Sequence, residues 1–146
     1  MQGETFLIDG VCGEVSPYIK TPKHIREEIE ANYPDNVLFT HYHPDHYDEA
    51  FRETYEKTTL RSVIGPESTI SGGLKGAEIV SVSTRHIGKS DFPHVSFVIK
   101  KDKSVWFMGD VSALALKEMD RFEKPDLLIV PYACVNTLSS IKNTKM

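Results

Sequence analysis

The chain has 146 residues, of which 40% are hydrophobic and 26% are charged. This is the size and composition of one globular domain, so we expect a single domain over residues 1–146 and exclude a wholly disordered chain. The formal net charge of -4 leaves no basic excess, so nucleic acid binding is unsupported.

Apolar runs in this chain are all far shorter than the roughly 20 residues that a membrane span requires. Residues 1–5 lack a basic segment followed by an apolar one, so we expect no secretory signal and a cytoplasmic protein. Cys12 and Cys134 are far apart and form no Cys-x-x-Cys pair, which favours two reduced thiols.

Short apolar runs alternate with helical stretches in the first half of the chain. Strands are predicted at residues 6–8, 36–40 and 61–65. A first helix is expected to begin with Thr21 as its N-cap and Pro22 in the first helical position, and to end before Pro34. A polar helix is expected from about residue 47 to residue 57.

The second half of the chain is richer in strands. Residues 78–84 alternate as a strand does, and residues 95–105 predict a hairpin with a polar turn. A helix is expected at 112–122 and a last buried strand at 127–130, and the polar tail after Pro131 predicts no definite structure. Several buried strands beside helices indicate a mixed α+β domain.

Three of the six histidines fall within the six residues 41–46, His-Tyr-His-Pro-Asp-His. Residues 41 and 43 are two apart, so in extended chain their side chains point the same way, and Pro44 disfavours helix at His43. Asp45 and His46 follow at the turn into the next helix. Imidazole and carboxylate donors at this spacing suit Zn²⁺, and also Fe, Mn or Ni.

Other polar residues also follow the ends of apolar strands. Asp9 follows residues 6–8, Asp110 follows residues 105–108, and each lies beside a glycine. His86 follows the strand at 78–84. Ligands collect at the carboxyl ends of strands in α/β folds, so these residues are candidates for the same site.

Taken together, residues 6–10, 40–46, His86 and 107–110 resemble the metallo-β-lactamase fold hydrolases in order and spacing, over roughly residues 5 to 131. Within the family, the chain resembles the cytosolic lactonase-like and phosphodiesterase-like members more than the secreted antibiotic hydrolases. The resemblance implies a four-layer αββα sandwich with one or two metal ions, zinc above all. By position, His41, His43 and His86 would hold the first ion, Asp45 and His46 the second, and Asp110 would bridge the two.

In that family a metal-bound hydroxide cleaves an ester, lactone or phosphodiester bond. Asp45 would orient the hydroxide and move its proton as a catalytic residue, while Asp9 would orient the ligands. These are expectations that the resemblance carries. Independently of the resemblance, Ser83 to Arg85, Lys89 and Lys101 could line a site for an anionic small-molecule substrate.

The chain departs from the family pattern in two places. Only five residues precede Phe6 where the family has a hairpin, and no histidine follows His94 to complete the second metal site. Cys134, Tyr132 or a neighbouring chain could take that place, and His94 could replace His86 as a ligand. We therefore expect a chain shortened at both ends, with exposed strand edges that favour a homo-oligomer.

Two functions remain open at this point. The first is a metal-dependent hydrolase, and the second is a metal-binding scaffold or assembly module of the same fold that has lost turnover. A nuclease of the same superfamily is a weaker third hypothesis, because the chain supplies no basic groove.

Overall fold

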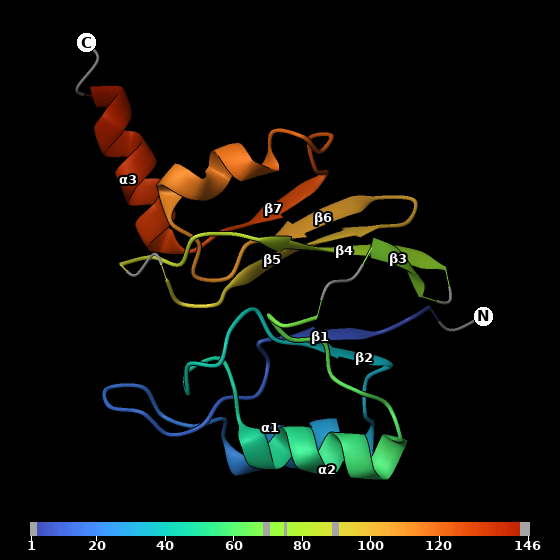
Figure 1. Ribbon diagram of the computed structural model, residues 1–146. Helices are drawn as coiled ribbons and strands as arrows, with labels where there is room; N and C mark the ends of the chain where they lie inside the picture. Colours follow the sequence, from blue (N-terminus) through green and yellow to red (C-terminus); the bar gives the residue numbers. More distant parts are fainter. Residues whose placement is uncertain (1–2, 69–70, 75, 89–90, 144–146) are drawn as a thin grey trace. The chain divides into compact units, whose positions relative to one another are not determined.

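A computed structural model describes residues 3–68, 71–74, 76–88 and 91–143 of the chain. The chain divides into two compact units, residues 1–65 and residues 66–146, here called the N-terminal and C-terminal units (Figure 1). Both units combine helices with a sheet, which confirms the predicted α+β class. None of the described helices is long and apolar enough to cross a membrane.

The N-terminal unit places two helices on one side of a two-stranded parallel sheet (Figure 1). Its elements in chain order are β1 (Phe6–Ile8), α1 (Lys23–Ala31), β2 (Asn36–Leu38) and α2 (Glu49–Thr59). The register pairs Phe6 with Asn36 and Ile8 with Leu38. The carboxyl ends of both strands therefore lie next to each other.

Aromatic side chains of α2 build the core of this unit. Phe51 and Tyr55 are fully buried and pack with Val37 and Phe39, which come from β2 and the residue after it. The helix begins at Asp48, whose carboxylate accepts a hydrogen bond of 2.7 Å from the Phe51 backbone N–H. This cap satisfies one of the donors that a helix start leaves open, so α2 presents its aromatic face to the sheet.

Three local predictions in this unit were wrong. Pro22, not Thr21, is the N-cap of α1, and the Thr21 hydroxyl instead accepts a 2.9 Å hydrogen bond from the Cys12 backbone N–H. Strand β2 ends at Leu38 rather than at residue 40. Residues 61–65 form no strand, because Ile64 makes only one isolated bridge, to Leu38.

The C-terminal unit is built on a five-stranded sheet in the order β3-β4-β5-β6-β7, in which only the pair β6–β7 is parallel. Its strands are β3 (Ser71–Leu74), β4 (Ala77–Ser83), β5 (Val95–Lys100), β6 (Ser104–Phe107) and β7 (Leu127–Ile129). Strands β5 and β6 are the predicted hairpin. Strand β3 was not predicted.

One face of this sheet packs against helical segments. Val82, Val98 and Trp106 contact residues of the 3₁₀ helix η1 (Ala113–Met119) and the buried Cys134 of α3 (Tyr132–Asn143). Residues 112–122 were predicted to be an α-helix, but the structure has the shorter and tighter 3₁₀ form there. Helix α3 lies in the tail for which the sequence predicted no definite structure.

Strand β7 differs from its prediction in burial. Leu127, Leu128 and Ile129 are 52%, 46% and 41% exposed, although an apolar run of this kind predicts a buried strand. Among the described strands, β7 pairs with β6 alone, at one end of the sheet. The chain therefore presents an apolar edge strand.

Candidate metal centre

In the N-terminal unit, the paired ends of β1 and β2 bring Asp9 next to Thr40. The Asp9 backbone N–H donates to the Leu38 carbonyl at 3.0 Å, which continues the strand pairing by one residue. The chain turns out of the strand at Asp9, whose backbone lies in the left-handed region with φ of +49°. Among residues other than glycine, aspartate and asparagine adopt this conformation most readily.

The Asp9 carboxylate accepts three hydrogen bonds. Its Oδ1 accepts from the Thr40 backbone N–H at 2.8 Å, and its Oδ2 accepts from the Thr40 hydroxyl at 2.6 Å. Oδ2 also lies 3.0 Å from Nδ1 of His46. The Asp9 side chain is only 6% exposed, so these bonds are sheltered from water. This arrangement fits the ligand-orienting role that the family resemblance implies for Asp9.

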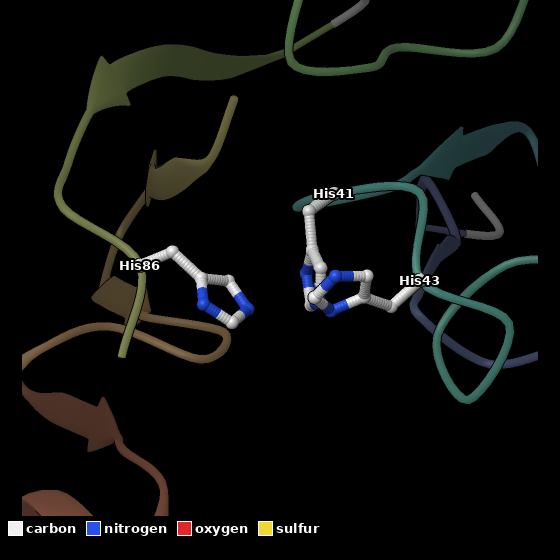
Figure 2. Close-up of side chains that lie close together, drawn as sticks. All are labelled: His41, His43 and His86. Carbon is white, nitrogen blue, oxygen red and sulfur yellow. The ribbon is translucent and has the colours of Figure 1, made fainter. Parts of the chain in front are cut away.

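The three histidines of residues 41–46 gather around the same point. The His41 ring lies 4.7 Å from the His43 ring, edge to face, and 4.3 Å from the His46 ring, measured between centroids. Figure 2 shows the first of these ring pairs where the chain continues beyond β2. The His46 backbone N–H donates to the His43 carbonyl at 2.9 Å, and this bond closes a turn at Pro44 and Asp45.

The donor set of this cluster fits a metal ion. Within the N-terminal unit, ligand atoms of Asp9, His41 and His46 lie within 4.8 Å of one another. Asp45 adds a carboxylate, with Oδ2 at 3.8 Å from His46 Nε2. Imidazole nitrogens and carboxylate oxygens are the ligands of Zn²⁺, Fe and Mn sites, and no thiolate takes part.

The C-terminal unit holds His86 and Asp110 side by side. An isolated bridge pairs His86 with Val111, and the Ile87 N–H donates to the Asp110 carbonyl at 2.8 Å. His86 Nε2 lies 3.9 Å from Asp110 Oδ2. Gly109, with φ of +54°, makes the turn between β6 and Asp110. These two residues come from segments 24 positions apart (110 − 86).

The His86 ring is oriented by the backbone next to it. Its Nδ1 lies 2.6 Å from the Ile87 carbonyl oxygen. A carbonyl oxygen can only accept, so Nδ1 of a neutral His86 carries the proton and Nε2 carries the lone pair. Figure 2 draws this side chain on the segment that follows β4. A ring oriented in this way is typical of histidine ligands.

His94 lies close to His86 and takes part in a buried chain of hydrogen bonds with hydroxyl groups. Its ring centroid is 5.5 Å from that of His86, and only 3% of the residue is exposed. His94 Nδ1 lies 2.9 Å from the Thr84 hydroxyl, which lies 2.9 Å from the Ser96 hydroxyl. Ser96 donates to the Met108 carbonyl at 3.1 Å. Both histidines thus lie at the same end of the sheet.

The structure thus brings the predicted residues together in two groups, each within its own unit. Asp9, His41, His43, Asp45 and His46 form the first group, and His86 and Asp110 form the second.

The proposed anion-binding residues do not all lie together. Ser83, Thr84 and the exposed Arg85 line one cavity of about 370 Å³, which Asp91 and His94 also line. Lys101 follows β5 at the opposite end of the sheet, because Ser83 pairs with Val95 and Glu78 pairs with Lys100. Lys89 lies outside the described residues.

Two residues suggested as substitutes for the late histidine lie on α3. Cys134 is fully buried in the apolar cluster against η1, and burial raises the pKa of its thiol. Tyr132 is 78% exposed. Neither residue therefore combines the burial and polar surroundings found around His41.

Sequence reasoning did not connect any hydroxyl group with the histidines. Thr40 contacts His41, and Thr84 contacts His94. Ser96 contacts Thr84, and these three hydroxyl residues are each at least 95% buried. A signal was available for Thr40, which is a polar residue between the apolar run 37–39 and a histidine. Buried hydroxyl groups of this kind are nearly always hydrogen-bonded.

Comparison with known proteins places this geometry in context. A family model described as a beta-lactamase superfamily domain matches residues 2–144. Among functionally curated proteins, the search found no match.

Two solved structures share the fold. One is isothiocyanate hydrolase from Delia radicum gut bacteria, with 20% sequence identity and a TM-score of 0.55. The other is a possible metal-dependent hydrolase from Veillonella parvula, with 15% identity and a TM-score of 0.59. Each comparison covers 88% of this chain, and 65% and 64% of the respective neighbour. The chain thus spans slightly less than two thirds of these relatives.

Proposed function

Because the chain belongs to the beta-lactamase superfamily, we propose that it is a metal-dependent hydrolase. The observation that carries this proposal is the cluster of Asp9, His41 and His46, whose ligand atoms lie within 4.8 Å of one another. A buried imidazole and a partly buried one, beside a carboxylate that already orients the second, are typical of a metal site.

We propose His41, His43 and His86 as ligands of a first ion. Asp45 and His46 are the proposed ligands of a second ion, with Asp110 shared by both. Support for His86 comes from its ring orientation, with Nδ1 at 2.6 Å from a backbone carbonyl, and from its position beside Asp110. Zinc is the proposed metal, and iron or manganese suits the same donors.

A bound divalent cation would supply Lewis acidity toward the substrate oxygen and a lowered pKa for water. Asp45 is the proposed catalytic residue, because its side chain is 25% exposed and a carboxylate oxygen there can accept a proton from water. Asp9 is buried and already accepts three hydrogen bonds, so it orients His46 and Thr40 rather than contacting the substrate.

The proposed substrates are small molecules with an ester, lactone or phosphodiester bond. The exposed Arg85, which shares its cavity with His94 and the carboxylate of Asp91, is the group that would contact an anionic substrate. An isothiocyanate belongs in the test panel as well, because one structural neighbour is an isothiocyanate hydrolase.

Metal analysis of the purified chain tests the proposal directly. We expect zinc, iron or manganese at one or two equivalents, and we expect His43→Ala to lose most of it. His24→Ala is the matched control, because His24 is exposed on α1 and should leave the metal content unchanged. A native chain that takes up none of these metals would refute the proposal.

Turnover separates the two functions that the sequence left open. Hydrolysis of a phosphodiester, lactone or isothiocyanate that falls in parallel with metal content in His43→Ala supports the hydrolase. Metal at one equivalent without turnover on the whole panel would instead favour a metal-binding scaffold of the same fold.

Self-association in the cytoplasm is a further part of the proposal. The exposed apolar edge strand β7 supports it, because such edges pair readily with another chain. Light scattering on the eluting protein should give the mass of a homo-oligomer, and Leu128→Lys should reduce it to 16.5 kDa. A native chain that elutes at this monomer mass would refute self-association and leave the proposed hydrolase function untouched.

A further inference from the structure

We propose that Thr40 is a positioning residue that sets the tautomer of His41. The Thr40 hydroxyl donates its proton to Asp9, so its oxygen can only accept a hydrogen bond from the His41 ring. As a result, a neutral His41 has its proton on Nδ1 and its lone pair on Nε2. All of these residues lie within the N-terminal unit.

The Thr40 hydroxyl has a single proton to donate. Thr40 Oγ1 lies 2.6 Å from Asp9 Oδ2, the range of a hydroxyl that donates to an ionised carboxylate. A carboxylate can only accept, so the Thr40 proton lies in this bond. Oγ1 therefore has no second proton to offer to any other partner.

The same oxygen lies 2.9 Å from Nδ1 of His41. Because Oγ1 can only accept in this second bond, Nδ1 must be the donor. A neutral imidazole carries one proton, so its Nε2 is then the nitrogen with the lone pair. The direction of both bonds thus follows from the charge on Asp9.

Asp9 acts on His46 in the same way, but without an intermediate. Asp9 Oδ2 lies 3.0 Å from His46 Nδ1, so this nitrogen must also donate. One carboxylate thus orients two imidazoles, His46 by a direct bond and His41 through Thr40. The two rings are 4.3 Å apart between centroids, and each has Nε2 as its lone-pair atom.

Burial keeps this arrangement from being replaced by water. Thr40 and His41 are both 0% exposed, and the Asp9 side chain is 6% exposed. The Thr40 backbone N–H also donates to Asp9, at 2.8 Å, so the carboxylate holds the residue at two points. These two bonds hold Thr40 where its hydroxyl oxygen also reaches His41 Nδ1.

The consequence for metal binding rests on the proposed function. His41 would bind an ion through Nε2, with its Nδ1–H bond already made before the ion arrives. Partners of this kind, one bond removed from the ion, contribute about 10- to 100-fold to metal affinity. Loss of the Thr40 hydroxyl should therefore weaken zinc binding by about that factor.

The tautomer can be measured in the metal-free native chain. Long-range proton–nitrogen correlation spectra of ¹⁵N-histidine protein at about pH 8, above the ordinary histidine pKa of about 6.5, distinguish a protonated ring nitrogen from an unprotonated one. His41→Gln identifies the signals of His41. We expect a protonated Nδ1 and an unprotonated Nε2. A protonated Nε2 on His41, alone or together with Nδ1, would overturn the inference.

Variants of Thr40 then test the relay itself. Thr40→Val keeps the shape and removes the hydroxyl, so the Nε2–H tautomer of His41 should become populated while His46 keeps its own. Thr40→Ser restores a hydroxyl and should restore the native tautomer and zinc affinity. Thr54→Val is the matched control, because it removes an exposed hydroxyl bond to the Ala50 carbonyl on α2.

A native tautomer and native zinc affinity in a folded Thr40→Val would refute the relay. The native-chain spectrum can refute it independently, even if this variant does not fold. Failure of the proposed function has a different signature. A chain with the expected His41 tautomer that binds no zinc would contradict the metal site and leave the role of Thr40 intact.

Discussion

Replacing Asp9 with alanine should strongly destabilise the metal-free chain. The carboxylate accepts the backbone N–H and hydroxyl of Thr40, which is fully buried, as well as Nδ1 of His46. A buried donor left without an acceptor costs about 1–3 kcal/mol. In the variant, the His46 side chain, which is 20% exposed, can turn toward water. The Thr40 hydroxyl can rotate and donate to Nδ1 of a His41 ring in its other tautomer. The buried Thr40 backbone N–H can do neither, so it is left without an acceptor.

The backbone of residue 9 adds a second contribution. Its φ of +49° is in the left-handed region, which costs alanine about 1–2 kcal/mol. We therefore expect Asp9→Ala to lower the free energy of unfolding by about 2–5 kcal/mol, the sum of one lost N–H bond and this strain. Asp9→Gly loses the same hydrogen bonds without the strain, so it should be about 1 kcal/mol less destabilised.

Urea unfolding followed by far-ultraviolet circular dichroism measures these differences at constant m-value. Asp35→Ala is the matched control. Asp35 Oδ2 also accepts the backbone N–H and hydroxyl of one threonine, Thr5, but its side chain is 39% exposed, so water can replace it. We expect this control to lose less than about 1 kcal/mol. Equal losses for Asp9→Ala and Asp35→Ala would refute the reasoning from burial.

Three further outcomes are expected from the described structure. Phe51→Ala should cost about 3–5 kcal/mol in urea unfolding, because this side chain is fully buried between α2 and β2, and a loss below about 1 kcal/mol would contradict the packing. Leu60→Gly should stabilise the chain by about 1 kcal/mol, because Leu60 is 90% exposed with φ of +58° at the end of α2, and destabilisation would count against strain there. Cys12 should react with a thiol reagent well before Cys134, which is buried with a raised thiol pKa, and Cys12→Ser should remove the fast phase.

The sequence was most informative where a local pattern determines a local structure. Pro44 and the spacing of His41 and His43 predicted an extended segment followed by a turn, and the His46-to-His43 backbone bond closes that turn. The hairpin of β5 and β6 followed from two apolar runs around a polar turn. Both features depend on residues that are near each other along the chain.

Other features depend on contacts between distant segments. The role of Thr40 requires that Asp9 lie beside it, and no local pattern states that pairing. The exposure of Leu128 depends on what packs on β7, whereas its sequence indicates only a strand. Residues 113–119 have apolar spacing that suits an α-helix and a 3₁₀ helix equally over so short a length.

Because β1 is short, it limits how long the Asp9 carboxylate stays beside Thr40 and His46. Only three residue pairs join β1 to β2, while Asp9 reaches across 31 positions to Thr40 and 37 to His46. If β1 detaches by local opening, His41 and His46 lose the Asp9 carboxylate that orients both rings, although residues 40–46 remain intact. Hydrogen exchange of the Asp9 and Thr40 backbone amides should therefore report a single opening event. The lifetime of the oriented histidine rings would be set by the opening of β1 rather than by residues 40–46 themselves.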